Sequence, residues 1–187
     1  MTRSPLLGVV LSAGASTRMG SPKALLKLPD GRHLVQAHVA ALAGVCDQVV
    51  VVGGAHTQAL AAALGPSTRL LDNVHWRHNH AVDSLALALR ETRVSQALVT
   101  PVDVPPAGAM DLAALVAAPS PAVLAWRDQP GHPVRLGPAL CERVRQGPVP
   151  GGLRTLLEDA TRVPASGPEV LLNLNTPASW AAWAAGD

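Results

Sequence analysis

The sequence predicts an α/β protein of three layers, α/β/α, in which helices cover both faces of a mainly parallel, Rossmann-like sheet. Apolar runs of strand length alternate along the chain with segments of helical periodicity. The strongest run, residues 48–54, is continuous and β-branched, as expected for a strand buried on both faces. Polar segments also follow predicted strands, at the carboxyl ends where open α/β sheets bind ligands. They are residues 12–23, 100–105 and 173–177.

The predicted strands are short apolar segments that end at glycine, proline or polar residues. In chain order they are residues 6–11, 48–54, 69–72, 96–100, 122–126, 134–136 and 170–174. The predicted helices have apolar residues spaced for one buried face. They are residues 33–43, 55–64, 82–92, 110–117, 138–145, 153–159 and 178–185. Gly65 and Pro66 end the second of these helices, and Asp83 or a neighbouring residue caps the third.

Length and composition indicate one domain that spans residues 1–187. Hydrophobic residues make up 48% of the chain, enough for a substantial core. The sequence contains no internal repeat and no linker. Residues 146–152 are rich in proline and glycine and are expected to form a surface loop.

Charge and aromatic content argue against nucleic acid and membranes as partners. The net charge is +2 without a run of Lys or Arg, and the chain has no Phe, no Tyr and only four Trp. No apolar stretch approaches the ~20 residues of a membrane span. The first apolar run ends in a glycine-rich loop, which favours a core strand over a signal peptide. Cys46 and Cys141 fit no metal or redox spacing, so reduced cysteines and a cytoplasmic location are expected.

The loop after the first predicted strand has the features of an anion-binding site. Residues 11–26 read LSAGASTRMGSPKALL. Gly14 and Gly20 permit backbone conformations that other residues resist, and the N–H groups of such a loop form a concavity for anions. Arg18 supplies a planar fork of donors and Lys23 a compact charge, a pair suited to a polyphosphate. The segment is neither a GxxxxGKS/T phosphate loop nor a GxGxxG motif, and a solvated loop with incidental cations is the alternative.

Two later segments carry oxygen ligands suited to a hard cation such as Mg²⁺. Asp103 lies between prolines in TPVDVPP, directly after a predicted strand, where the backbone is restrained. Asn173 and Asn175 are two residues apart in LLNLNTP, so their side chains would share one face if the last strand reached them. The alternative for all three is the ordinary role of Asp and Asn in turns.

Taken together, these motifs resemble those of the MobA-like nucleotidyltransferases, enzymes of GT-A-type fold that attach a nucleotide to the molybdenum cofactor. The first loop matches the family pattern L-x-A/G-G-x-S-x-R-M-G-x-x-K-x-L-L in register, and the other motifs follow in family order. The resemblance implies that the early part of the loop, with Leu11, Ala13 and Gly14, binds the nucleoside. It implies that Arg18 and Lys23 hold the triphosphate.

The resemblance also implies a metal site and a catalytic set. Asp103 matches the metal-binding acid of the family's D-x-P segment. Asn175 matches the second ligand in its D-x-D-T-P or N-x-N-T-P segment, so the two residues would hold Mg²⁺. Arg18, Lys23 and Asp103 would then be the catalytic residues.

Four further residues complete the implied site. Ser84 and Thr100 would lie near the nucleotide. Gly131 and His132 belong to a GHPV segment that the family places on the acceptor side of the cleft, where His132 would donate to a phosphate or pterin group. A histidine in an ordinary turn is the alternative for His132.

The segment after the third predicted strand, NVHWRHNHAVDS, departs most from the family pattern. Trp76 matches the family's W-x-x-G-M segment, but Asn79 and His80 replace Gly-Met and the segment is longer. His75, His78 and His80 are close in sequence, as metal ligands can be. Since no cysteine or carboxylate completes a set in register, a polar rim of the active site is favoured.

The implied reaction is transfer of CMP from CTP to the terminal phosphate of molybdenum-bearing molybdopterin, with release of pyrophosphate. Ala13, where guanylyl-transferring relatives have a second glycine, and GHPV favour CTP, whereas N-x-N-T-P is typical of the guanylyl branch. One alternative is guanylyl transfer from GTP to the same cofactor, and another is transfer to a sugar phosphate or other small phosphate. The non-enzymatic alternative is a carrier that delivers the finished cofactor to a client molybdoenzyme, the one protein partner that the resemblance suggests.

Overall fold

The computed structural model describes residues 4–78 and 80–185, and at its centre is a seven-stranded sheet. The strands run across the sheet in the order β3-β2-β1-β4-β6-β5-β7. They are β1 (Leu6–Leu11), β2 (Gln48–Gly53), β3 (Arg69–Asp72), β4 (Gln96–Pro101), β5 (Ala122–Trp126), β6 (Gln129–Leu136) and β7 (Thr161–Pro164). All pairings are parallel except those of β6, which runs antiparallel to β4 and β5.

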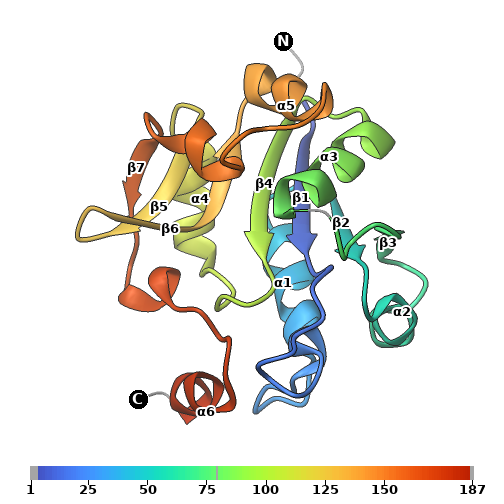
Figure 1. The fold of residues 1–187 in the computed structure, drawn as a ribbon. Coiled ribbons are helices and arrows are strands. Elements are labelled where there is room, and N and C mark those ends of the chain that lie inside the picture. Colours follow the sequence, from blue (N-terminus) through green and yellow to red (C-terminus); the bar gives the residue numbers. More distant parts are fainter. Residues whose placement is uncertain (1–3, 79, 186–187) are drawn as a thin grey trace.

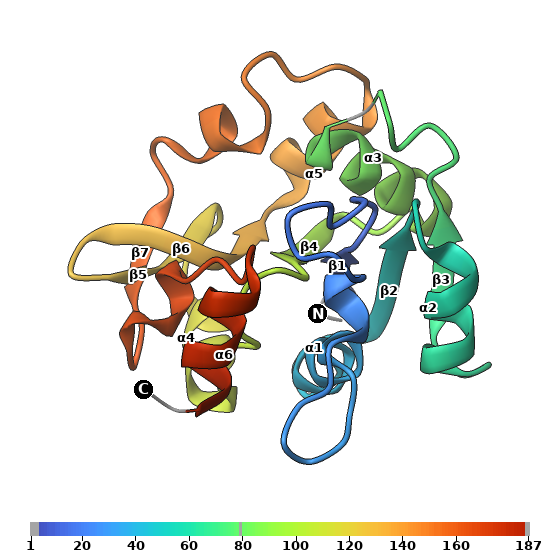
Figure 2. The same cartoon turned by 60° about the horizontal axis from the view of Figure 1, so that its bottom comes forward.

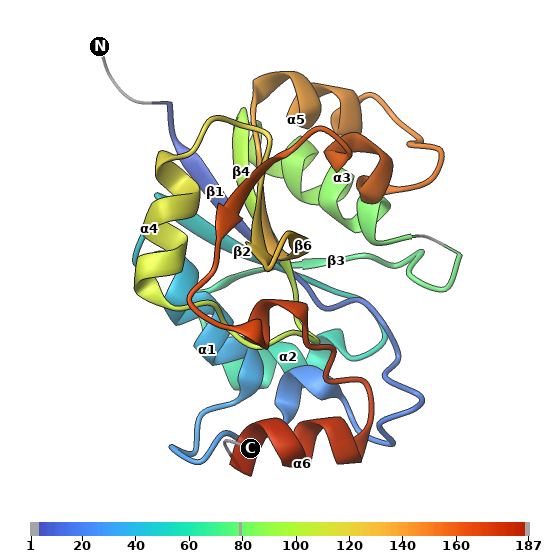
Figure 3. The same ribbon diagram turned by 90° about the vertical axis from the view of Figure 1, so that its left-hand side faces the viewer.

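Helices cover both faces of this sheet (Figure 1, Figure 3). One face carries α1 (Leu34–Ala43) and α4 (Ala109–Ala117), and the other carries α3 (Ala81–Thr92) and α5 (Pro138–Arg145). The other helical segments are α2 (Thr57–Leu64), α6 (Pro177–Ala185) and the 3₁₀ helices η1 (Lys23–Leu25), η2 (Leu153–Leu157) and η3 (Pro168–Leu171). In residues 4–78 and 80–185, no helix is long and apolar enough to span a membrane.

The central strands are apolar along their whole length because both of their faces are covered. In β1, Leu7 and Val9 belong to the core on the α3–α5 side, whereas Leu6 and Val10 belong to the core on the α1–α4 side. Full burial of one such side chain contributes roughly 1.5–3 kcal/mol, so both layers stabilise the same strand. The predicted class, three-layer α/β/α with a mainly parallel sheet, is confirmed.

Because β6 runs antiparallel to β4, the first residues of β6 lie next to the carboxyl end of β4. Val134 of β6 is opposite Val99 of β4 in the antiparallel register. Continuing that register toward the start of β6 brings His132 alongside Pro101, at the carboxyl end of β4. A parallel strand in this position would place His132 at the other end of the sheet.

The structure corrects two predicted elements near the C-terminal end. The predicted strand at residues 170–174 is wrong, because Val170 lies in η3 and residues 172–175 have no regular structure. Val170 and Leu174 instead fill the core on the α1–α4 side, which explains their apolar character. The predicted helix at residues 153–159 is only the short 3₁₀ helix η2.

The last strand, β7, was not predicted. Its sequence is TRVP, which is four residues long and buries only Val163. With an arginine and a proline among its four residues, the segment lacks the apolar pattern that predicts a strand. The strand exists because β5 offers it a parallel edge, a tertiary effect that local sequence does not carry.

Candidate active site

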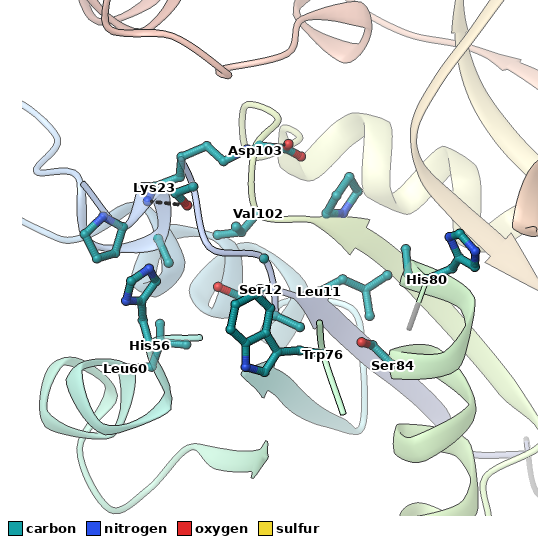
Figure 4. A pocket seen from close by; sticks show the side chains of 17 residues that line it. Leu11, Ser12, Lys23, His56, Leu60, Trp76, His80, Ser84, Val102 and Asp103 are labelled. Carbon is teal, nitrogen blue, oxygen red and sulfur yellow. Dashed lines mark hydrogen bonds and ion pairs between the residues drawn. The ribbon is translucent and has the colours of Figure 1, made fainter. Parts of the chain in front are cut away.

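The loops at the carboxyl ends of β1, β2 and β4 enclose a pocket of about 310 Å³ (Figure 4). Figure 2 shows the loop after β1, the loop after β4 and the segment before α6 gathered at this end of the molecule. The lining residues are Leu11, Ser12, Ala13, Gly14, Ser16, Pro22, Lys23, Ala24, His56, Leu60, Trp76, His80, Ala81, Ser84, Pro101, Val102 and Asp103. The pocket thus lies where sheets of this kind bind ligands.

The loop after β1 is closed by contacts within itself. Ser16 and Gly20 have φ angles of 55° and 75°, in the left-handed region that glycine adopts readily. The hydroxyl of Ser16 accepts a 3.1 Å hydrogen bond from the N–H of Lys23, which fixes the start of η1. Gly14 borders the pocket, and a Cβ there would meet nothing within 4 Å. The loop therefore presents open backbone to the pocket at Gly14.

The backbone of Ala13 packs closely against Gly54. A Cβ on Gly54 would lie 2.6 Å from the carbonyl oxygen of Ala13 and 2.8 Å from Cβ of Trp76, so only glycine fits between them. The N–H of Ala55 donates to the same carbonyl oxygen at 3.0 Å. Because Ala13 and Trp76 both line the pocket, this packing fixes the width of the pocket at Ala13.

Lys23 connects the three polar segments that the sequence singled out. Its ammonium donates to Oδ2 of Asp103 at 2.8 Å and to Oδ1 of Asn175 at 2.7 Å. The side chains of Lys23 and Asp103 are 14% and 25% exposed, so the ion pair is partly shielded from solvent. Segments distant in sequence therefore converge on one point.

The oxygens around Lys23 also suit a divalent metal. A carboxylate and an amide oxygen already converge on one cation, and both are ligands that Mg²⁺ and Mn²⁺ accept. In the described part of the chain, no group of three or more His, Cys, Asp or Glu could hold a metal. A metal at Asp103 and Asn175 would therefore take its other ligands from phosphate and water, as Mg²⁺ commonly does.

The loop that carries Asp103 is anchored through its backbone. The carbonyl oxygen of Asp103 accepts a 2.7 Å hydrogen bond from the N–H of Leu174, next to Asn175. His38 of α1 is 2% exposed, and its Nε2 lies 2.9 Å from the carbonyl oxygen of Val104. Burial lowers the pKa of His38 to about 4, so the ring is neutral near pH 7 and donates through Nε2–H.

A smaller cavity of about 110 Å³ adjoins the main pocket, with which it shares Ser16 and Lys23. Its lining residues are Ser16, Thr17, Arg18, Lys23 and Asn175. Arg18 and Lys23, the two cations predicted to meet a polyphosphate, therefore border the same cavity.

A second pocket, of about 630 Å³, lies between η2 and the β5–β6–β7 part of the sheet. It contains both residues predicted on the acceptor side, and its lining is Val123, Pro130, Gly131, His132, Val134, Leu153, Arg154, Leu157, Glu158, Ala160 and Arg162. Val123 is in register with Val134 on one side and with Arg162 on the other, so these three side chains share one face of the sheet. The pocket combines aliphatic walls with two guanidinium groups and one carboxylate.

His132 connects the second pocket with the Asp103 loop. Its Nδ1 is buried and has no hydrogen-bond partner among the described residues. Burial lowers the pKa of His132, while the charge of Asp103 acts in the opposite direction, so the two side chains lie within electrostatic range. The neighbouring Gly131 cannot be replaced freely, because a Cβ there would lie 2.1 Å from the carbonyl oxygen of Val170. The tight contact is with η3, which leads to the Asn175 segment.

Ser84 and Thr100, both predicted near the nucleotide, lie in different places. Ser84 lines the main pocket, and its hydroxyl accepts a 2.9 Å hydrogen bond from Nδ2 of Asn73. Thr100 is buried on the opposite face of β4, where it borders a small cavity with His38 and Leu112. Alternation along the strand turns its side chain away from the pocket, so its position gives the predicted nucleotide contact no support.

Of the three histidines His75, His78 and His80, one lines the main pocket. His80 is part of the lining, whereas His75 and His78 are exposed. Asn79, where the sequence departs from the family pattern, lies outside the described residues. Among the residues that are described, these histidines form no metal-binding group, and His80 alone reaches the pocket rim.

Several lining residues were not expected from the sequence. His56 caps α2 and Leu60 lies within it, and nothing in the local pattern distinguishes them from ordinary helix residues. Arg154 and Arg162 belong to η2 and β7, the elements that were misassigned or missed. Asn173 is exposed and does not join Asn175 at Lys23, because the strand that would align them is absent.

The chain resembles known proteins in sequence and in structure. Residues 8–165 match the family model of the MobA-like NTP transferase domain. The probable molybdenum cofactor guanylyltransferase of Rhodopirellula baltica is 34% identical over 130 residues, which cover 67% of this chain. The match spans 58% of that protein's length, less than two thirds.

Two solved mycobacterial structures share the fold over almost their whole length. A homologue of Mycobacterium tuberculosis Rv0371c, from Mycobacterium sp. strain JC1, has a TM-score of 0.79 and 26% identity, covering 99% of this chain and 98% of that one. Rv0371c of M. tuberculosis H37Rv, in complex with manganese, has a TM-score of 0.79 and 21% identity, covering 98% and 100%.

The fold and the family match agree on the class of protein, a nucleotidyltransferase domain. Because the family model covers most of the chain, the chain belongs to the MobA-like NTP transferase family. The family and the class of enzyme expected from the sequence are confirmed.

Proposed function

We propose that the protein transfers a nucleotidyl group from a nucleoside triphosphate, CTP, to the terminal phosphate of molybdenum-bearing molybdopterin. The observation that carries this proposal is the convergence of Lys23, Asp103 and Asn175 at 2.7–2.8 Å, at the edge of the main pocket. A second pocket begins at His132, within electrostatic range of Asp103. Two substrates could therefore meet at Asp103.

The nucleotide would occupy the main pocket and the adjoining cavity. Leu11, Ala13, Gly14 and Ser84 line the main pocket and would surround the nucleoside. Arg18 and Lys23 would neutralise the triphosphate and then the leaving pyrophosphate, the principal requirement of phosphoryl-type transfer. Thr100 is left out of this arrangement because its side chain faces the other side of β4.

Asp103 and Asn175 would hold the divalent metal. A bound Mg²⁺ supplies Lewis-acid stabilisation and a template for the α-phosphate. The Asp103 loop is fixed by His38 and Leu174, so its carboxylate would be preorganised for that position. The manganese complex of Rv0371c is consistent with a divalent ion in a protein of this fold.

The acceptor would lie in the second pocket with its phosphate directed past His132 toward Asp103. That phosphate is already ionised near neutral pH and needs no general base to attack the α-phosphorus. The buried Nδ1 of His132 lacks a hydrogen-bond partner among the described residues and would donate to the acceptor when protonated at that nitrogen. The aliphatic walls would pack against the flat faces of a pterin.

The choice of base distinguishes the two main candidate reactions. Ala13 lines the main pocket and its backbone packs against Gly54, so its methyl group would narrow the pocket and favour a pyrimidine. The name of the R. baltica relative and the amide at Asn175 favour guanylyl transfer from GTP as the second candidate. Asn175 faces Lys23 rather than the Ala13 wall, so we give it less weight for base selection.

The test compares kcat/KM for CTP with kcat/KM for GTP, using molybdenum-loaded molybdopterin at fixed Mg²⁺. The rate is measured as the release of pyrophosphate. We expect CTP to be preferred, and Ala13→Gly to raise the use of GTP. A preference of the unmodified protein for GTP would assign it to the guanylyl branch. If pyrophosphate is released only with sugar phosphates, the acceptor is a sugar phosphate and not molybdopterin. Binding of the finished cofactor without any magnesium-dependent turnover would indicate a delivery protein.

Two expectations from the sequence also remain proposals. We infer a single NTP-transferase domain over residues 1–187, supported by one sheet that takes strands from Leu6–Leu11 through Thr161–Pro164. A cytoplasmic location and a client molybdoenzyme rest on the sequence and on the proposed reaction. Copurification of the protein with a molybdoenzyme would test the latter.

A further inference from the structure

The position of Lys23 poses a problem for any metal at Asp103 and Asn175. The ammonium nitrogen lies 2.8 Å from Oδ2 of Asp103 and 2.7 Å from Oδ1 of Asn175. These are the two oxygens that a divalent ion would need, and Mg²⁺ would have to approach each to about 2.0–2.1 Å. An ammonium and a divalent ion cannot share so small a space, because both would be desolvated cations in contact with each other.

We propose that Lys23 is a gate on the metal site, closed by its own ammonium and opened by a polyphosphate. Resting on the proposed function, this inference assigns Lys23 two successive partners. In the nucleotide-free protein the ammonium satisfies Asp103 and Asn175. When a nucleoside di- or triphosphate binds, the ammonium turns to its phosphate oxygens and the two oxygen ligands become available.

The movement would involve the Lys23 side chain alone. The Lys23 N–H is fixed by its 3.1 Å hydrogen bond to Ser16, and Lys23 is the first residue of η1. A lysine side chain is a flexible four-carbon stem with a compact charged end, so it can change partners without a backbone shift. The cavity beside it already offers a destination, since Lys23 and Asn175 line that cavity together with Arg18.

The shape of the site decides which ligands open the gate. The 110 Å³ cavity at Arg18 adjoins the main pocket at Ser16 and Lys23, so a phosphate chain that leaves the main pocket enters it there. A monophosphate in the main pocket would not extend into that cavity and would leave the ammonium in place. Asp103 and Asn175 supply two oxygen ligands at this point, so the same phosphates would also add ligands to the metal's shell.

The experiment measures metal binding rather than turnover. Mn²⁺ is titrated into the protein alone, with CMP, and with the α,β-methylene analogues of CTP and GTP, while EPR follows free Mn²⁺ against protein-free blanks. We expect Mn²⁺ to bind at least ~10-fold more tightly with the preferred analogue than with CMP or with no nucleotide. Equal affinity in all of these conditions would overturn the gate, and this comparison needs no variant.

The decisive variant is Lys23→Met, which keeps the length of the side chain and removes its charge. Because the competing cation is gone, Lys23→Met should bind Mn²⁺ without nucleotide at least ~10-fold more tightly than the unmodified protein. Lys27→Met, at an exposed lysine in the same segment, should leave Mn²⁺ affinity unchanged. If Lys23→Met binds Mn²⁺ no better than the unmodified protein, the ammonium does not close the site.

Failure of the gate and failure of the proposed function give different results. Nucleotide-dependent Mn²⁺ binding without any transfer to molybdopterin would leave the gate standing and remove the reaction assignment. Magnesium-dependent transfer by a protein that binds Mn²⁺ equally well without nucleotide would leave the reaction standing and remove the gate.

Discussion

At the scale of single residues, the position of Asp103 is set by its backbone. The hydrogen bond between the Leu174 N–H and the Asp103 carbonyl oxygen ties the Asp103 loop to the segment that carries Asn175. His38 holds the next residue, Val104, which lies between Asp103 and the two prolines that follow. A change to the Asp103 side chain therefore leaves the loop in place and changes only the chemistry at its tip.

This arrangement predicts different results for the two proposed metal ligands. Asp103→Ala should abolish magnesium-dependent pyrophosphate release while the thermal unfolding midpoint changes little. Asn175→Asp should retain much of the activity, because a carboxylate oxygen can replace a neutral oxygen ligand. Initial rates over a range of Mg²⁺ concentrations, with circular dichroism as the control for folding, measure both. Near-normal activity of Asp103→Ala would mean that the metal is held elsewhere.

At the scale of secondary-structure elements, the second pocket depends on β6, β7 and η2. The register places Arg162 of β7 on the same face as Val123 and Val134, below η2. All three elements are distant in sequence from the loop of residues 11–26. The proposed acceptor pocket is therefore formed by strand pairing, and its lining can change without a change in the loop of residues 11–26.

Arg162→Ala tests whether that pocket receives the acceptor. Loss of a hydrogen bond to a charged group costs roughly 1.5–3 kcal/mol, so the KM for molybdopterin should rise about 10- to 100-fold. The KM for the nucleotide should stay constant, because Arg162 does not line the main pocket. Arg127→Ala, at an exposed arginine in the β5–β6 connection, is the matched control. An equal rise in both KM values would contradict a separate acceptor pocket.

The same elements explain how far the sequence alone could lead. The strands β1, β2 and β4 were predictable because a strand buried on both faces has a nearly continuous run of apolar residues. These strands are Leu6–Leu11, Gln48–Gly53 and Gln96–Pro101. The part of the main pocket formed by residues 11–24 could be located from the sequence, because one loop motif carries it. By contrast, β7 exists through its pairing with β5, and η3 uses apolar residues that resemble a strand. Arg154 and Arg162 belong to this second group, so local pattern could not reveal them.

At the scale of the whole molecule, His38 links the active site to global stability. It lies in α1, is 2% exposed and contacts the Asp103 loop, so it must be neutral in the folded protein near pH 7. Burial lowers its pKa from the ordinary value of 6.5 to about 4. Between these two values the unfolded chain binds more protons than the folded one, so stability is complete above pH 6.5 and falls as the pH drops toward 4.

Acid should therefore destabilise the protein in that pH window, by up to about 3 kcal/mol from His38 alone. Urea unfolding at pH 7, 5.5 and 4.5 measures the slope. His38→Gln keeps a side-chain N–H donor but cannot titrate, and should flatten the slope. His78→Gln, at an exposed histidine, should not. An unchanged slope in His38→Gln would show that other groups cause the acid sensitivity, with the buried His132 the next to examine.

The late position of Asn175 in the chain has a consequence for how the protein is made. The ribosome delivers β1 to β4 and Asp103 long before the segment after η3, and the four parallel strands form one side of the sheet by themselves. Domains begin to fold during synthesis, so a growing chain can pair Lys23 with Asp103 while Asn175 is still missing. A chain that stops early would then hold the proposed nucleotide loop without Asn175, the second proposed metal ligand. The order of synthesis itself would delay the proposed metal-dependent chemistry until nearly the whole polypeptide has emerged.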